Sequence, residues 1–111
     1  MRNATVWTGM FRVEKSTVID GVEDESESIV VSVRPRMSAT RRCGLCQRRC
    51  PRYDHGEGRR RWRGPDLGLL RSFLEADAPR VTCPTHGLVV ASVPWARHGA
   101  RHTRAFEDTV A

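Results

Sequence analysis

Two stretches of mostly hydrophobic, β-branched residues, separated by a polar segment, dominate the first third of the chain. Residues 17–22 and 29–33 are rich in β-branched side chains and flank an acidic, polar segment at 23–28. This pattern predicts a β-hairpin whose tip is the acidic segment. Pro35 predicts the end of the second strand, because proline lacks the N–H that a sheet ladder needs. Before the hairpin, hydrophobic residues at helical spacing in 4–14 predict a short helix.

Further short strands are predicted along the second half of the chain. Residues 59–68 carry many arginines around Trp62, and this composition predicts an exposed edge strand anchored by the tryptophan. The hydrophobic spacing of residues 69–76 suits a helix as well as a strand, so periodicity leaves their structure open. Residues 79–83 and 87–93 predict two strands joined by a tight turn.

The last stretch of the sequence predicts a helix. Thr103 can act as its N-cap, because a threonine hydroxyl can accept a hydrogen bond from a backbone N–H of the first turn. Phe106 and Val110 then lie on one face. With the helix near the N-terminus, the expected architecture is α+β, with short β-hairpins and terminal helices.

Length and charge narrow the range of functions. The chain has 111 residues, which make at most one domain. Its hydrophobic core is expected to be small, so that a cross-link such as a bound metal would add to its stability. Its net charge of +6 hides an asymmetry: residues 1–33 carry three basic and six acidic groups, whereas residues 41–64 carry nine arginines and two acidic groups. We find neither a long apolar run nor a secretory leader, and so expect a cytoplasmic chain without membrane contact.

Three cysteines and one histidine follow the spacing of a zinc site. Structural zinc is held tetrahedrally by thiolate and imidazole ligands, usually as two pairs from two turns. Cys43 and Cys46 form one pair with two residues between them, and Cys83 and His86 form a second pair after 36 intervening residues. In a reducing compartment such cysteines indicate metal ligands or redox thiols rather than disulfides. The pattern therefore predicts a structural Zn2+ site.

Other interpretations of the cysteines stay open. Cys50 follows Cys46 by four positions and can replace His86 in an all-cysteine ligand set. Thiols that bind no metal are a second alternative. A redox role for Cys43 and Cys46 is less favoured, because the residues that follow them make a poor helix start.

The arginines around and beyond the first cysteine pair predict a positive face. Such a face neutralises phosphates and binds nucleic acid in a salt-dependent way with little sequence preference. The alternative is a solvated surface whose arginines reflect GC-rich codons. The candidate nucleic-acid-binding residues are Arg41, Arg42, Arg48, Arg49, Arg52, Arg59, Arg60, Arg61 and Arg63.

Three stretches of the sequence carry a family signature. They are "RCGLCQRRCPRYDHGEGRRRWRGPDLG", "PRVTCPTHGLVVASVPWARHGARHTRAFEDTVA" and the upstream "VIDGVEDESESIVVSVRPR". In these residues the chain resembles the insertion-sequence transposases of the ISL-three type, in particular their actinobacterial members. The resemblance implies an N-terminal zinc-binding domain with Cys43, Cys46, Cys83 and His86 as its ligands, and it favours a strand at 69–76.

The resemblance also implies a division of the chain and a role for it. We expect residues 1–37 to form a helix and a hairpin, residues 38–96 a zinc-binding ribbon, and residues 97–111 the start of a helix that leads to an absent downstream domain. In the family, a helix-turn-helix region and an RNase-H-like catalytic domain follow. Their acidic catalytic residues have no counterpart here, so we expect a non-catalytic portion rather than an enzyme.

The expected partner is DNA, in particular the terminal repeats of the element, with self-association or contact with other transposase domains as a further expectation. Two other functions stay open. The ribbon can be a protein-interaction module for transposase assembly, or the thiols can belong to a stand-alone redox or metal-sensing protein.

Overall fold

The first hairpin forms where the two β-branched stretches predict it. In the computed structural model, which describes residues 16–109, β1 (Thr17–Glu25) and β2 (Ser28–Pro35) run antiparallel around a short turn. The alternation of β2 places Val31 and Val33 in the core, where both are buried. The predicted hairpin is confirmed.

A second hairpin follows in the arginine-rich segment. β4 (Arg59–Leu67) and β5 (Leu70–Asp77) pair antiparallel through a turn at Gly68, whose φ of +60° lies in the left-handed region that glycine adopts without strain. The segment whose periodicity suits a helix or a strand is thus a strand. Its residues Leu74 and Ala76 alternate onto the buried face.

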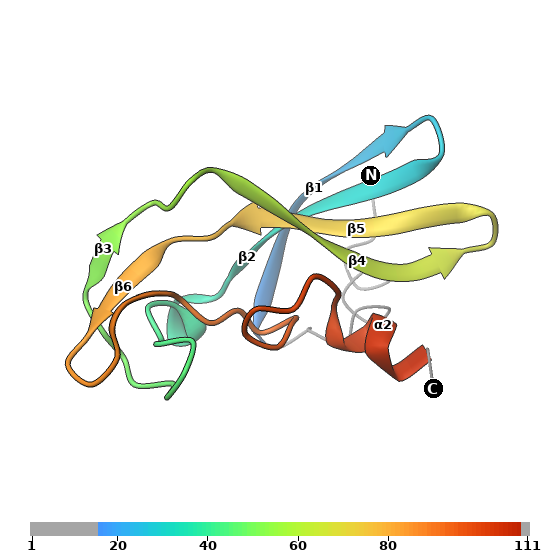
Figure 1. Cartoon of the computed structure of the whole chain (residues 1–111). Helices are drawn as coiled ribbons and strands as arrows, with labels where there is room; N and C mark the ends of the chain where they lie inside the picture. The colour runs from blue at the N-terminus through green and yellow to red at the C-terminus, as the bar shows by residue number, and fades with distance from the viewer. Residues whose placement is uncertain (1–15, 110–111) are drawn as a thin grey trace.

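The two hairpins join into one four-stranded sheet. β2 and β5 pair in parallel, from Ser28 beside Arg71 to Ser32 beside Glu75, and the strand order is β1-β2-β5-β4. Figure 1 shows this sheet as a twisted layer in which both hairpin turns lie at the same end. Each hairpin has one hydrophobic face, and the pairing of β2 with β5 allows both faces to cover a common core.

A smaller sheet carries one of the cysteine-containing turns. It consists of β3 (Arg52–Asp54), β6 (Arg80–Cys83) and β7 (Gly87–Val90), in the order β3-β6-β7. β3 leads into β4 and β5 leads into β6, so one long bent ribbon connects the two sheets (Figure 1). The bend requires a glycine, because a Cβ at Gly56 would lie 2.2 Å from the carbonyl oxygen of Ala78.

The main core lies between the large sheet and the segment that follows β7. Trp62 of β4 meets Trp95 of that segment edge to face, with ring centroids 5.4 Å apart and an interplanar angle of 75°. Both side chains are buried and pack in one cluster with Leu74. β4 lies at one edge of the sheet order, which confirms the predicted edge strand anchored by Trp62.

The chain then runs along β4 before its last helix. The Arg63 N–H donates to the Arg101 carbonyl, and the Thr103 N–H donates to the Arg63 carbonyl. The hydroxyl of the buried Thr103 accepts a hydrogen bond of 3.0 Å from the Phe106 N–H and caps α2 (Arg104–Thr109). The start of this helix is therefore fixed to the edge of the large sheet.

The fold is more β than the α+β class predicted from the sequence. The described residues contain seven strands, but only the six-residue α2 and the 3-10 turn η1 (Met37–Ala39) are helical. Terminal helices are therefore not supported as a feature of the fold, and residues 4–14 lie outside the described part. Strands prevail because the described segments alternate with a period of two and bury their apolar side chains in sheets.

The expected three-part division of the chain stays a prediction. The pairing of β2 with β5 places residues from the first two of its segments in one sheet. Among the described residues, no helix has the length and hydropathy needed to cross a membrane.

Truncation of Trp62 tests the main core. Trp62→Ala removes the ring contact with Trp95 and leaves a cavity beneath the sheet, so we expect the free energy of unfolding to fall by about 3–5 kcal/mol. Leu69→Ala is the control, because Leu69 is 101% exposed in the β4–β5 turn and its truncation should change stability by less than about 0.5 kcal/mol. Denaturant unfolding gives both values. Equal losses in the two variants would contradict the assigned core.

Candidate metal centre

The first cysteine pair lies on a tight turn shortly after η1. The Gln47 N–H donates to the Cys43 carbonyl, and the Cys43 N–H donates to the Arg48 carbonyl. Gln47 has a φ of +65°, a left-handed conformation that costs a non-glycine residue about 1 kcal/mol. The Leu45 N–H also donates to the Cys43 Sγ, at 3.4 Å. The turn is held by its own hydrogen bonds despite this local strain.

The second pair lies on the turn between β6 and β7. Cys83 ends β6 and pairs with Gly87, which begins β7 with a φ of +73°. Backbone hydrogen bonds from His86 and then from Thr85 lower the pKa of the Cys83 thiol to about 6. Cys83 is therefore mostly a thiolate at neutral pH, which is the form that binds metals.

The two turns bring four ligand atoms together. The sulfurs of Cys43, Cys46 and Cys83 and a ring nitrogen of His86 all lie within 4.8 Å of one another. The Cys46 and Cys83 sulfurs are 3.8 Å apart, and His86 Nδ1 lies 3.6 Å from Cys43 Sγ and 3.7 Å from Cys83 Sγ. At the usual bond lengths, a tetrahedral zinc requires about 3.8 Å between two sulfurs and about 3.6 Å between sulfur and nitrogen. The cluster therefore fits Zn2+.

The burial of the four residues indicates a structural role for the metal. Cys43 and Cys83 are buried, whereas Cys46 and His86 are exposed. The two buried cysteines share a small core with Cys50, Val81 and Ala91, which are also buried. Four protein ligands close the coordination shell and leave no open position for a substrate, as in structural rather than catalytic zinc sites.

Cys50 lies beside the cluster and outside it. Its side chain is buried in the same small core, and its thiol donates to the Arg48 carbonyl at 3.3 Å. Desolvation, together with the neighbouring Cys83 thiol, raises the pKa of Cys50. Because Cys50 lies outside the group of four ligand atoms, the geometry favours His86 over Cys50 as the fourth ligand.

The loop before α2 contacts the first cysteine turn. A Cβ at Gly44 would lie 2.1 Å from His98 Nδ1 and 2.7 Å from the Val90 carbonyl oxygen, so a larger residue would displace both segments. Arg60 of β4 donates to the Ala100 carbonyl in the same loop, at 2.8 Å. These contacts connect the first cysteine turn, which we call the metal turn, to the large sheet. The only sequence signal for them is a glycine between two cysteines, which does not identify the partner.

The candidate arginines of the first turn are mostly exposed. The exposed ones are Arg41, Arg48, Arg49 and Arg52, and within residues 16–109 none of them pairs with an acidic side chain. Arg42 differs, because it is half-buried and donates to the carbonyls of Gln47 and Ser38. Its guanidinium supports the turn. We call the four exposed residues the turn arginines.

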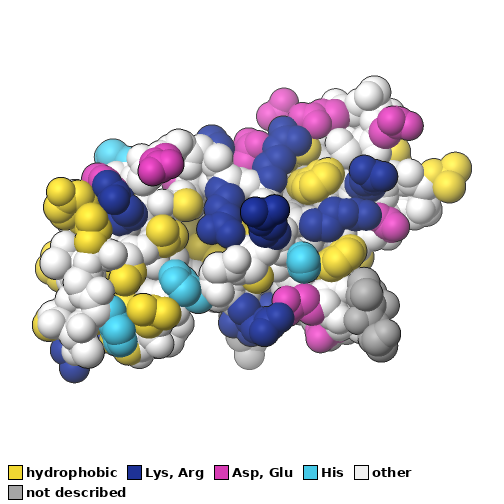
Figure 2. Space-filling model, viewed as in Figure 1, with side chains coloured by type: hydrophobic (Ala, Val, Ile, Leu, Met, Phe, Trp, Pro, Cys, Tyr) yellow, Lys and Arg dark blue, Asp and Glu magenta, His cyan; other side chains and the backbone are white. Residues whose placement is uncertain are grey.

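The candidate arginines of β4 are engaged within the fold. The outer-face pairs are Arg59–Asp77, Arg59–Glu75, Arg61–Glu25, Arg61–Glu75 and Arg63–Asp66. The intervening Arg60 lies over the Trp62 ring at 5.1 Å. Figure 2 shows basic and acidic side chains interspersed over the large sheet. The nine candidates thus form two groups with different surroundings.

A zinc-binding cluster with two ligands on a small sheet turn defines the class of zinc ribbons. Residues 39–86 match the family described as zinc-finger of transposase IS204/IS1001/IS1096/IS1165. This match confirms the resemblance to insertion-sequence transposases seen in the sequence.

Two curated relatives match the chain along its whole length. Both are described as "Transposase for insertion sequence element IS1557" from Mycobacterium tuberculosis, in the strains CDC 1551 / Oshkosh and ATCC 25618 / H37Rv. Each is 50% identical over 117 residues, which cover 100% of this chain and 26% of the relative. The chain therefore spans about a quarter of the length of these transposases. No solved structure matches it.

Single cysteine replacements test the ligand set. Cys83→Ser removes a buried thiolate at the centre of the cluster, so we expect the zinc content to fall from about one ion per chain to near zero. Cys50→Ser is the matched control, because it makes the same atomic change in the same small core, and it should keep about one zinc. Elemental analysis of the purified chains measures both.

His86→Ala separates the two proposed ligand sets. It should lose zinc if His86 is the fourth ligand. Full zinc in Cys83→Ser would contradict both ligand sets. Loss of zinc in Cys50→Ser with retention in His86→Ala would replace His86 by Cys50 as the fourth ligand.

Proposed function

We propose that the chain is the N-terminal, DNA-holding portion of a transposase, and that its zinc ion fixes the surface that contacts DNA. The observation that carries this proposal is the group of turn arginines beside the metal cluster, in a chain whose residues 39–86 match a transposase zinc-finger family. Guanidinium groups without carboxylate partners are suited to bidentate contacts with phosphates. The metal turn would present them together, because its backbone is closed by hydrogen bonds.

The proposal narrows the predicted contact surface to the turn arginines. Three of the four β4 arginines already pair with neighbouring carboxylates. A phosphate at that surface would also meet the charge of Glu25, Glu75 and Asp77. Repulsion from these groups opposes DNA binding there. We therefore assign the β4 arginines to holding the strands together and the turn arginines to DNA.

In this proposal the chain itself performs no strand cleavage or joining. The four-ligand zinc site leaves no position for a substrate, and the chemistry belongs to other parts of a transposase. The DNA is that of the terminal repeats of the element, in the cytoplasm. Self-association of the domain would bring two such ends together.

A protein-interaction module is the second candidate. Leu45 on the first turn and Leu88 just after the second turn are 58% and 46% exposed. Exposed leucines near both metal turns suit an apolar contact with another transposase domain or a second copy. Self-association that is insensitive to salt, in a chain that does not bind DNA, would favour this function.

Salt titrations of duplex binding test the proposal. Each phosphate contact contributes about 0.9 to the slope of log affinity against log salt, so Arg48→Ala with Arg49→Ala should reduce the slope by about 1.8 and weaken binding to any duplex. Arg59→Ala with Arg61→Ala removes the same charge from paired positions and should leave the slope near its wild-type value. Fluorescence anisotropy with a random-sequence duplex measures both.

Two results would contradict the proposal. One is the absence of duplex binding by the zinc-loaded chain at low salt. The other is a slope that falls in the β4 double variant and not in the turn variant, which would assign DNA to the sheet.

A further inference from the structure

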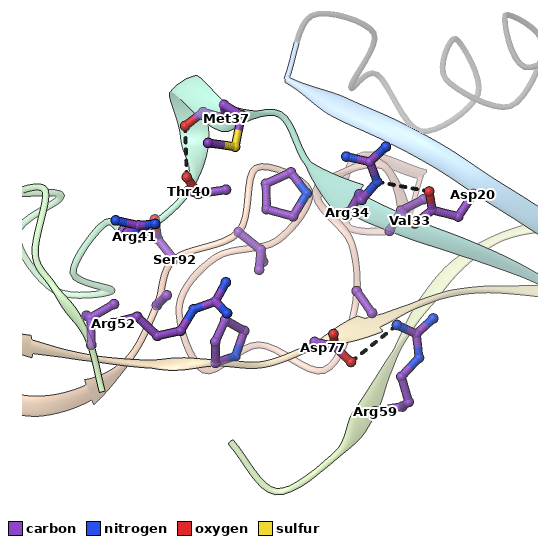
Figure 3. A pocket seen from close by; sticks show the side chains of 16 residues that line it. Asp20, Val33, Arg34, Met37, Thr40, Arg41, Arg52, Arg59, Asp77 and Ser92 are labelled. Carbon is purple, nitrogen blue, oxygen red and sulfur yellow. Dashed lines mark hydrogen bonds and ion pairs between the residues drawn. The ribbon is translucent and has the colours of Figure 1, made fainter. Parts of the chain in front are cut away.

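A cavity of about 300 Å3 lies between the two sheets. Its walls come from the ends of β2 and β5, the segment from η1 to the metal turn, and the residues after β7 (Figure 3). This volume is at the lower end of the range of small-ligand sites, about 300–1,000 Å3. None of the four zinc ligands lines the cavity. It is therefore a separate feature of the fold.

The floor of the cavity is apolar. Val33, Ala76 and Val81 line it, and all three are at most 2% exposed. Pro35 and Pro79 also line it and add apolar rings without backbone N–H donors. Such walls suit a planar, weakly polar group, because a polar group without partners loses its hydrogen bonds to water on entering.

Charged groups occupy two sides of the cavity. Arg41 and Arg52, both turn arginines, lie on one side in Figure 3, and the side chain of Arg52 extends into the space. On the other side lie two ion pairs, Arg34–Asp20 at 3.0 Å and Arg59–Asp77 at 3.3 Å. Both pairs use the Oδ1 oxygen of the aspartate. The cavity therefore offers anion contacts at one end and, at the other, aspartate carboxylates that also pair with arginines.

A nucleotide has the same order of chemical groups. Its phosphate is an anion, its base is a flat ring with apolar faces, and its exocyclic amino groups donate hydrogen bonds. We propose that the cavity takes one unpaired nucleotide at the end of a bound DNA strand, with its phosphate on Arg41 and Arg52 and its base over the apolar floor. This inference rests on the proposed DNA-holding function, since the same turn arginines border the cavity.

The consequence is that the domain recognises a strand end and not only continuous duplex. A base inside a duplex is stacked and paired and cannot enter a cavity between two sheets. An overhanging nucleotide needs no unstacking of a pair. Recognition of this kind would place the end of a DNA strand at a fixed position relative to the zinc ribbon.

Binding to two duplexes that differ by one nucleotide tests the inference. We expect the zinc-loaded chain to bind a duplex with a one-nucleotide overhang, on either the 5′ or the 3′ strand, about tenfold more tightly than the blunt duplex, as one charged hydrogen bond allows. Arg52→Gln should remove this preference. Arg48→Gln is the matched control: it removes the same charge from a turn arginine outside the cavity, so it should weaken both duplexes equally and keep the preference.

A second variant tests the space in the cavity without changing its charged residues. Val93→Phe places a larger ring at the cavity wall and leaves every charge in place, so it should abolish the preference and keep blunt-duplex affinity. Equal affinity of the wild-type chain for blunt and overhanging duplexes, with normal salt-dependent binding, would overturn the cavity assignment and leave the proposed function intact. Failure to bind either duplex would overturn the proposed function itself.

Discussion

The meeting of two distant turns at one tetrahedral point is the constraint on which the rest of the structure depends. The small sheet has three short strands, and its core consists of Cys43, Cys50, Val81, Cys83 and Ala91. This is little apolar surface with which to offset the entropy of ordering the chain. Sulfur and nitrogen atoms 3.6–3.8 Å apart match the edges of a zinc tetrahedron. Metal binding therefore supplies folding free energy that the core lacks.

The large sheet supports this metal-dependent end. Its core around Trp62 and Trp95 is independent of the cysteines, and its strands continue into β3 and β6 through the bend at Gly56. The sheet satisfies its β4 arginines with its own carboxylates, whereas the metal turn leaves its arginines exposed. Charge is thus neutralised on the supporting sheet and remains available on the turn that the metal fixes.

Local features and the metal-ligand pairs were predictable from the sequence, and the other contacts between distant segments were not. The first hairpin, the Thr103 cap and the grouping of Cys43 and Cys46 with the second pair each depend on residues whose spacing carries the signal. The parallel pairing of β2 with β5 depends on two hairpin edges meeting in space, which no local pattern encodes. The same holds for the arginines of β4, because their acidic partners lie on other strands. A charge count alone therefore merges two groups of arginines that the fold separates.

Amide hydrogen exchange with and without zinc tests most directly whether the metal holds the small sheet. Removal of zinc by a chelator should expose the amides of β6, β7 and the first cysteine turn to rapid exchange. One equivalent of zinc should restore their protection. Amides of β2 and β5, which flank the tryptophan core, should remain the more protected set after chelation. Unchanged protection of β6 and β7 in the metal-free chain would contradict the claim that zinc, and not the apolar core, holds this sheet together.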